Sequence, residues 1–135
     1  VCSSDLIIGT KDYAAEQSGI EKLGENHVYF LPYLMGERSP HNDPAARGTF
    51  VGMTMDTTRS DLTQAVMEGV AFALRDSYEI AKGLGLSIPR SKIVGGGAKN
   101  AFLNDLTEKA TGKKVIALQI EATAIGNLKI QMRLP

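Results

Sequence analysis

The sequence predicts an α/β domain. In its second half, short apolar runs typical of strands alternate with longer segments in which apolar residues recur at helical spacing. This order favours a parallel strand pair, because a crossover helix joins strands that run in the same direction. The chain has 135 residues, which suffice for one domain with a core. Apolar residues make up 43% of the chain and charged residues 22%, as in ordinary soluble proteins.

The first third predicts a helix, a strand and a loop. Residues 12–23 are modestly helical. Residues 27–34, HVYFLPYL, form a dense apolar run that predicts a buried strand ending in a turn at Pro32. Residues 36–48, GERSPHNDPAARG, are rich in turn-forming types and predict a loop. A polar loop of this length is uncommon unless it is functional or covers another surface.

The middle of the chain predicts a short strand over residues 49–55 and then a long helix. Thr58 and Asp61 match a capping box. Apolar and small residues then recur every three or four positions: Leu62, Ala65, Val66, Gly69, Val70, Ala73, Leu74, Ser77 and Ala81. Because many of them are small, a neighbouring element can approach closely. Gly83 and Gly85 signal the end of the helix.

The last third repeats the strand-and-helix order. Residues 92–94 predict a short buried strand, and residues 100–111 a second helix that ends at Gly112. The apolar face of this helix comprises Phe102, Leu103, Leu106 and Ala110. Residues 115–118 predict a third strand, and Thr123 begins a further helical pattern.

Composition limits the partners that we expect. Fifteen basic residues balance fifteen acidic ones, so there is no general attraction to nucleic acid or to an anionic membrane. Cys2 is the single cysteine, which excludes a disulfide within one chain and favours a reducing compartment. The sequence has no apolar run of roughly 20 residues and no signal-peptide pattern. We therefore expect a cytoplasmic protein with no nucleic-acid or membrane partner.

Several side chains allow both a functional and a structural interpretation. In the polar loop, His41 and Asp43 could serve as a general base, but a solvated loop with internal salt bridges is the simpler interpretation. Arg47 predicts bidentate bonds to carboxylates that organise the loop. Glu68 adjoins the small-residue face of the long helix and could cap a neighbouring element. Methionines at 53, 55 and 67 predict core positions.

The strongest local signal is IVGGGAKNAF, residues 93–102. A strand is followed by three glycines and the start of a helix, whose free N–H groups and dipole suit a nucleotide ribose or phosphate. A tight turn without a ligand is the alternative. The segment is not a P-loop, because no Gly-Lys-Ser/Thr follows. It fits a dinucleotide fingerprint poorly, because Asn100 stands at the third glycine position, although Glu121 keeps that alternative open.

Three motifs in order resemble the FGGY family of carbohydrate kinases. They are GERSPHNDPAARG, then GTFVGMTMDTTRSDLTQAVMEGVAFALRDS, then IVGGGAKN, and the resemblance spans residues 10–126. Residues 48–68 fit the second family signature. YLMGERSPHNDPAARG is most similar to the xylulokinase branch, whereas IEATAIGN is closer to the rhamnulokinase branch. The resemblance implies that residues 10–135 form part of the C-terminal domain, truncated at both ends, while residues 1–9 stay unplaced.

The resemblance implies an actin-like, ribonuclease H-like ATPase fold that uses ATP and Mg²⁺ to phosphorylate a ketose. The glycine turn would then face adenosine, and the implied ATP-binding residues are Gly96, Gly97, Ala98, Lys99 and Asn100. The family's aspartate base and both of its phosphate loops lie upstream of this segment, so no residue here is expected to be catalytic or to bind metal. The isolated segment is expected to be inactive, and a homodimer is possible for this class.

Three alternatives stay open on the sequence. Another FGGY kinase, such as a rhamnulokinase, would share the same motifs. A non-catalytic nucleotide-binding module of the actin-like class would explain the missing aspartate. A dinucleotide-binding domain would explain only the first two glycines. For the isolated chain we also expect a marginally stable monomer, because the long helix and residues 27–34 offer apolar faces that need neighbours.

Overall fold

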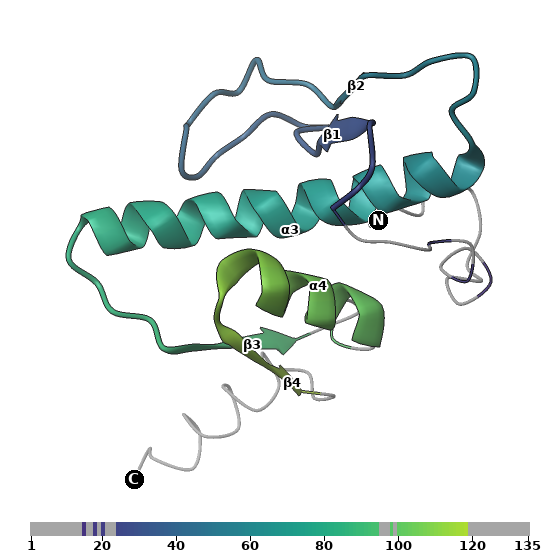
Figure 1. Cartoon of the computed structure of the whole chain (residues 1–135). Helices are drawn as coiled ribbons and strands as arrows, with labels where there is room; N and C mark the ends of the chain where they lie inside the picture. The colour runs from purple at the N-terminus through teal and green to yellow at the C-terminus, as the bar shows by residue number, and fades with distance from the viewer. Residues whose placement is uncertain are drawn as a thin grey trace, which may run out of the picture.

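A computed structural model describes residues 15, 18, 20, 24–94, 98 and 100–118 of the chain. Its elements, in order, are β1 (Tyr29–Leu31), β2 (Thr49–Val51), α3 (Arg59–Gly83), β3 (Arg90–Val94), α4 (Ala101–Thr111) and β4 (Lys114–Leu118) (Figure 1). β1 and β2 pair antiparallel, and β3 and β4 pair parallel. The predicted α/β order and its parallel pair are therefore confirmed. The helical pattern from Thr123 onward lies outside the described residues.

Helix α3 is the centre of the molecule, with β1 and β2 on one side and α4, β3 and β4 on the other (Figure 1). On the first side Val28 and Phe30 of the β1 segment pack against Ala65 and Val66 of α3. A second cluster on the opposite side joins α3 to α4 and consists of Met67, Ala71 and Leu106, with Phe102 and Ala110 packed against it. Burial on two faces explains why nearly every residue from 63 to 71 is inaccessible to solvent.

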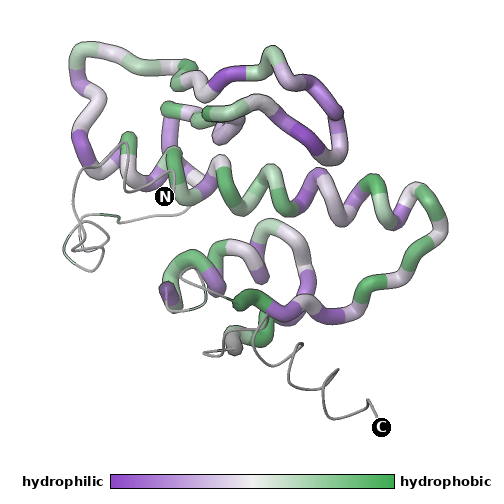
Figure 2. Tube along the Cα trace, turned by 180° about the vertical axis from the view of Figure 1, so that it is seen from behind, coloured by the Kyte–Doolittle hydropathy of each residue, from purple (hydrophilic) through white to green (hydrophobic). Residues whose placement is uncertain are grey.

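The ends of α3 follow the sequence signals. The Thr58 side chain accepts a hydrogen bond from the Asp61 backbone N–H, and the Asp61 carboxylate accepts one from the Thr58 N–H, which completes the predicted capping box. Leu84 caps the other end, and Gly85 follows with a φ of +82°. Hydrophobic and hydrophilic residues alternate along the helix, the pattern of an amphipathic element (Figure 2).

The predicted close approach to α3 occurs at Gly69. A Cβ atom at this position would lie 2.2 Å from the Phe30 carbonyl oxygen, so only glycine lets the β1 backbone sit directly on the helix. Phe30 also stacks on Phe50 of β2, with ring centroids 4.6 Å apart. The hairpin is thus fixed to α3 at its centre.

Three predictions about burial are wrong. The strand expected over residues 27–34 is three residues long, and its outward side chains Tyr29 and Leu31 are 61% and 46% exposed. The strand expected to be buried over residues 92–94 alternates instead, with Val94 42% exposed. Of the methionines, only Met67 lies in the core, because Met53 and Met55 follow β2 at the surface. In each case a layer that would cover the outer face is absent from the described residues.

Of the helix expected over residues 12–23, the structure describes Ala15, Ser18 and Ile20. Ala15 and Ser18 are helical, and the Ser18 hydroxyl donates to the Ala15 carbonyl at 2.7 Å. The other positions of that prediction lie outside the described residues.

Candidate functional site

The glycine-rich connection joins the end of β3 to the start of α4, as the sequence predicted. Of the five candidate residues, Ala98 and Asn100 are described, whereas Gly96, Gly97 and Lys99 lie outside the described residues. Ala98 is 5% exposed, so its side chain contributes to packing. The ligand-binding role of all five residues stays a prediction.

Asn100 begins α4. Its side-chain oxygen accepts a hydrogen bond from the Leu103 backbone N–H at 3.0 Å, which satisfies one of the donors that every helix start leaves free. The helix dipole makes this end of α4 weakly positive. A capped helix start is an arrangement suited to a ligand with negative charge or polar oxygens.

A residue that the sequence analysis missed lies one turn into the helix. The Asn104 amide nitrogen donates to the Ala98 carbonyl at 3.1 Å and so ties α4 back to the connection. The spacing from Asn100 to Asn104, four residues, puts both on one face of α4, the face from which Asn104 reaches Ala98. The sequence feature that could have identified Asn104 is an asparagine inside a predicted helix, because asparagine is a weak helix former and its presence there suggests a specific role.

The strand that leads into the connection is itself held by α3. The Tyr78 hydroxyl donates a short hydrogen bond to the hydroxyl of Ser91, the second residue of β3. Leu106 of α4 packs against Met67 and Ala71 of α3. Both sides of the connection are therefore fixed to the same central helix.

The polar loop of residues 36–48 is organised by a glutamate. Glu37 is 9% exposed, and its carboxylate accepts the backbone N–H groups of His41 and Asn42 at 2.7 and 3.0 Å. The prediction for Arg47 is wrong, because its guanidinium donates to the carbonyls of Pro44 and Ala46 at 2.9 and 2.7 Å. The backbone N–H groups of the loop bind the Glu37 carboxylate, and Arg47 is left at the exposed end of the loop.

Tyr33 and His41 connect this loop to α3. His41 Nε2 lies 3.9 Å from a carboxylate oxygen of Asp76, and its ring meets that of Tyr33 edge-on with centroids 6.4 Å apart. Burial, followed by the negative charges of Asp76 and Glu37, raises the pKa of the Tyr33 hydroxyl. Tyr33 therefore stays protonated near neutral pH. The His41 and Asp76 side chains are about half exposed, which makes their contact weak.

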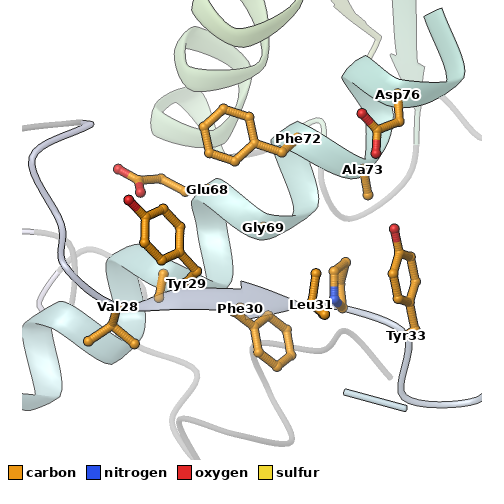
Figure 3. Close-up of a pocket in the computed structure, with 12 residues that line it drawn as sticks. Val28, Tyr29, Phe30, Leu31, Tyr33, Glu68, Gly69, Phe72, Ala73 and Asp76 are labelled. Carbon is orange, nitrogen blue, oxygen red and sulfur yellow. The ribbon is translucent and has the colours of Figure 1, made fainter. Parts of the chain in front are cut away.

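A pocket of about 130 Å³ lies between the β1 segment and α3, and neither Ala98 nor Asn100 lines it (Figure 3). Glu68 and Tyr29 stand at one end of the pocket, and Asp76 and Tyr33 stand at the other. The Glu68 carboxylate is already bonded to the Gly24 N–H at 2.9 Å and to the Gln64 amide at 2.7 Å. Glu68 thus secures the segment before β1, and its capping of a neighbouring element stays a prediction.

Neither a metal-binding cluster nor a membrane-spanning helix is present among the described residues. No three or more His, Cys, Asp or Glu side chains gather there in a way that could hold a metal ion. In the same residues, no helix combines the length and apolarity needed to cross a bilayer.

Comparison with known proteins places the chain among sugar kinases. The profile of the FGGY family of carbohydrate kinases, C-terminal domain, matches residues 5–134. The xylulose kinase of Staphylococcus xylosus is 42% identical over 79 residues, which is 58% of this chain and 16% of that protein. Glycerol kinase 1 of Lactiplantibacillus plantarum is 34% identical over 114 residues, 83% of this chain and 23% of that protein.

The fold also matches solved structures. The crystal structure of xylulose kinase from Bifidobacterium adolescentis superimposes on this chain with a TM-score of 0.76 at 36% identity. The match covers 92% of this chain and 25% of that one. The chain therefore spans about a quarter or less of the length of these relatives, and its α/β fold is part of the actin-like ATPase fold that they share.

Proposed function

This chain belongs to the FGGY family of carbohydrate kinases, and from this premise we propose that it is the nucleotide side of an ATP-dependent xylulokinase. In that proposal the whole protein transfers the terminal phosphoryl group of ATP to D-xylulose and forms D-xylulose 5-phosphate. The observation that carries it is the connection from β3 to α4, which has a glycine-rich sequence and a helix start capped by Asn100. The proposed adenosine contacts are those predicted from the sequence: Gly96, Gly97, Ala98, Lys99 and Asn100.

In phosphoryl transfer, the role that we propose for this segment is to position ATP. Phosphoryl transfer depends on alignment and on charge neutralisation, and Mg²⁺ bound to the phosphate oxygens supplies much of the latter. The described residues hold no cluster of three or more His, Cys, Asp or Glu side chains, and we assign no Mg²⁺ ligand to them. We likewise assign no catalytic base here. The segment's proposed work is to hold the adenosine end of ATP.

Xylulose is the favoured sugar because the xylulose kinase of Staphylococcus xylosus shares 42% identity, against 34% for glycerol kinase 1 of Lactiplantibacillus plantarum. The glycerol kinase match extends over more of the chain, however, so glycerol is the second candidate substrate. We further propose a cytoplasmic location, in keeping with the single cysteine. A homodimer is compatible with the exposed apolar residues of β1 and β2.

Ligand-dependent melting tests the proposal on the chain itself. A ligand that binds only the folded state stabilises that state, and the melting temperature rises with the logarithm of the ligand concentration once it exceeds the Kd. ATP at millimolar concentration should raise it, whereas NAD and D-xylulose at equal concentration should not. Stabilisation by NAD alone would favour a dinucleotide-binding domain. Stabilisation by D-xylulose alone would mean that this segment binds the sugar and not the nucleotide. Either result would overturn the assignment.

The activity itself requires the longer polypeptide that carries this segment. That protein should phosphorylate D-xylulose in preference to glycerol, as measured by ADP release with each substrate in parallel. Binding of ATP without turnover of any sugar would favour the non-catalytic alternative.

A further inference from the structure

Asn104 is a polar side chain with one half of its amide used and the other half buried and unused. Its Nδ2 donates to the Ala98 carbonyl at 3.1 Å. A carbonyl oxygen can only accept, so this bond fixes which amide atom faces Ala98. The Oδ1 atom on the other side is buried and accepts no hydrogen bond within the part of the chain that the structure describes.

Packing alone does not explain an asparagine at this position. The neighbouring inward residues of α4 are apolar, notably Phe102 and Leu106. The next polar residue on that side, Thr107, is 2% exposed and fully satisfied, because its hydroxyl donates to the Leu103 carbonyl at 2.7 Å. A leucine of nearly the same size at position 104 would avoid the cost of a buried, unpaired acceptor. Departures of this kind are expected where a residue serves a site.

We propose that Asn104 is a positioning residue for the nucleotide connection. Its amide holds the carbonyl of Ala98, one of the residues proposed to contact adenosine, and so fixes the Ala98 backbone against α4 before a ligand arrives. A ligand that meets a preordered backbone does not have to pay the entropy of ordering it. This inference rests on the proposed function, since it concerns the same site.

Substitution of Asn104 by leucine separates a positioning role from a structural one. Asn104→Leu removes the bond to Ala98 and the unpaired acceptor together, so the melting temperature should change little. ATP·Mg affinity should nevertheless fall about three- to tenfold, the cost of ordering a connection that is no longer held. The measurement is an NMR titration of the 135-residue chain with ATP·Mg up to millimolar concentration, followed through the amides of residues 98–104.

Thr107→Val is the matched control. It removes a side-chain bond to a helix carbonyl on the same element, one turn farther from the connection, and should leave ATP affinity unchanged. Asn104→Asp is the second variant in case leucine prevents folding. It keeps the size of the side chain but replaces the donor with a carboxylate oxygen, and it should weaken ATP binding at least as much.

Each outcome decides the inference. Loss of affinity in both Asn104 variants with unchanged affinity in Thr107→Val supports the positioning role. Unchanged affinity in the Asn104 variants overturns that role while the proposed function stands. Equal loss in all three variants overturns it as well, because the effect would then be structural. Failure of the unsubstituted chain to bind ATP overturns the inference together with the proposed nucleotide site.

Discussion

At the scale of single residues, Gly69 decides how the two halves of the fold meet. A Cβ at this position would lie 2.2 Å from the Phe30 carbonyl oxygen, which is backbone and cannot turn aside. In most helices glycine costs about 1 kcal/mol relative to alanine. Here that cost is offset by the burial of Val28 and Phe30 against α3, which a bulkier residue would prevent.

Substitution of Gly69 by alanine should therefore destabilise the fold by at least about 2 kcal/mol, since the added methyl group overpacks the contact with β1. Gly83→Ala is the matched control, because Gly83 ends the same helix and has no atom within 4 Å of the position of a Cβ. It should be neutral or slightly stabilising. Urea unfolding of both variants measures the difference. Equal stability of the two variants would refute the close approach.

The capping box makes a second prediction at this scale. Hydrogen bonds from the Thr58 backbone and side chain lower the pKa of the Asp61 carboxyl. A carboxyl whose pKa is lower in the folded state stabilises that state above its unfolded pKa of about 3.9 and loses the effect as pH falls through the folded value. Asp61→Asn should cost about 1 kcal/mol near neutral pH and less below pH ~4. Unfolding free energies at both pH values test this, and identical losses would count against it.

Residue roles were predictable where their cause is local. Thr58 and Asp61 lie three residues apart, so the sequence alone identifies the cap. Glu37 and Arg47 could not be assigned in the same way, because the backbone N–H groups that Glu37 binds come together only when the loop folds. The role of Asn104 was missed for a related reason, since its partner Ala98 precedes the first residue of α4 and the contact between them depends on how the chain enters the helix.

At the scale of elements, the polar loop of residues 36–48 is held in its conformation by hydrogen bonds to one carboxylate, that of Glu37. Glu37 accepts two backbone donors and pairs through its own backbone N–H with the Asp43 carbonyl at 2.8 Å. Charge-assisted hydrogen bonds in a buried setting are stronger than neutral ones. The loop should thus lose its conformation when this one side chain is shortened.

Glu37→Ala should accelerate backbone hydrogen exchange at His41 and Asn42 by about tenfold or more, given the strength of hydrogen bonds to charged groups. The neighbouring exposed Arg38→Ala serves as the control and should leave both amides unchanged. Exchange measured by NMR distinguishes them. Unaltered protection in Glu37→Ala would mean that other contacts hold the loop.

The helices were predicted well and the strands less well. For α3 and α4 the caps and the helical spacing of apolar residues lie within the segment itself, so Arg59–Gly83 and Ala101–Thr111 follow closely from the sequence. Strand burial depends on what covers each face, which no local pattern records. The run over residues 27–34 therefore appeared fully buried, although Tyr29 and Leu31 point outward.

At the scale of the whole molecule, α3 carries an apolar layer on each side, and each layer has exposed apolar residues on its outer face. Tyr29 pairs across the hairpin with Val51, and both are more than half exposed. Leu31 shares their face, because side chains two apart on a strand point the same way. An exposed apolar surface of this kind favours association.

The chain should accordingly associate as its concentration rises. The double variant Leu31→Asn with Val51→Thr should shift it toward the monomer, because it makes that face polar while keeping a β-branched residue in β2. Met55→Gln is the control, since Met55 is fully exposed but lies outside the hairpin strands. Sedimentation velocity over a range of concentrations reports the result. A monomer at every concentration before substitution would contradict the prediction.

The central claim is that ATP binds at the connection between β3 and α4. Hydrogen exchange of the chain with and without ATP·Mg tests it most directly. Binding there predicts slower exchange at residues 95–100 and at the first turn of α4, with no change in residues 28–33 beside the pocket. Protection of residues 28–33 instead, or no protection at the connection at saturating ATP, would contradict it.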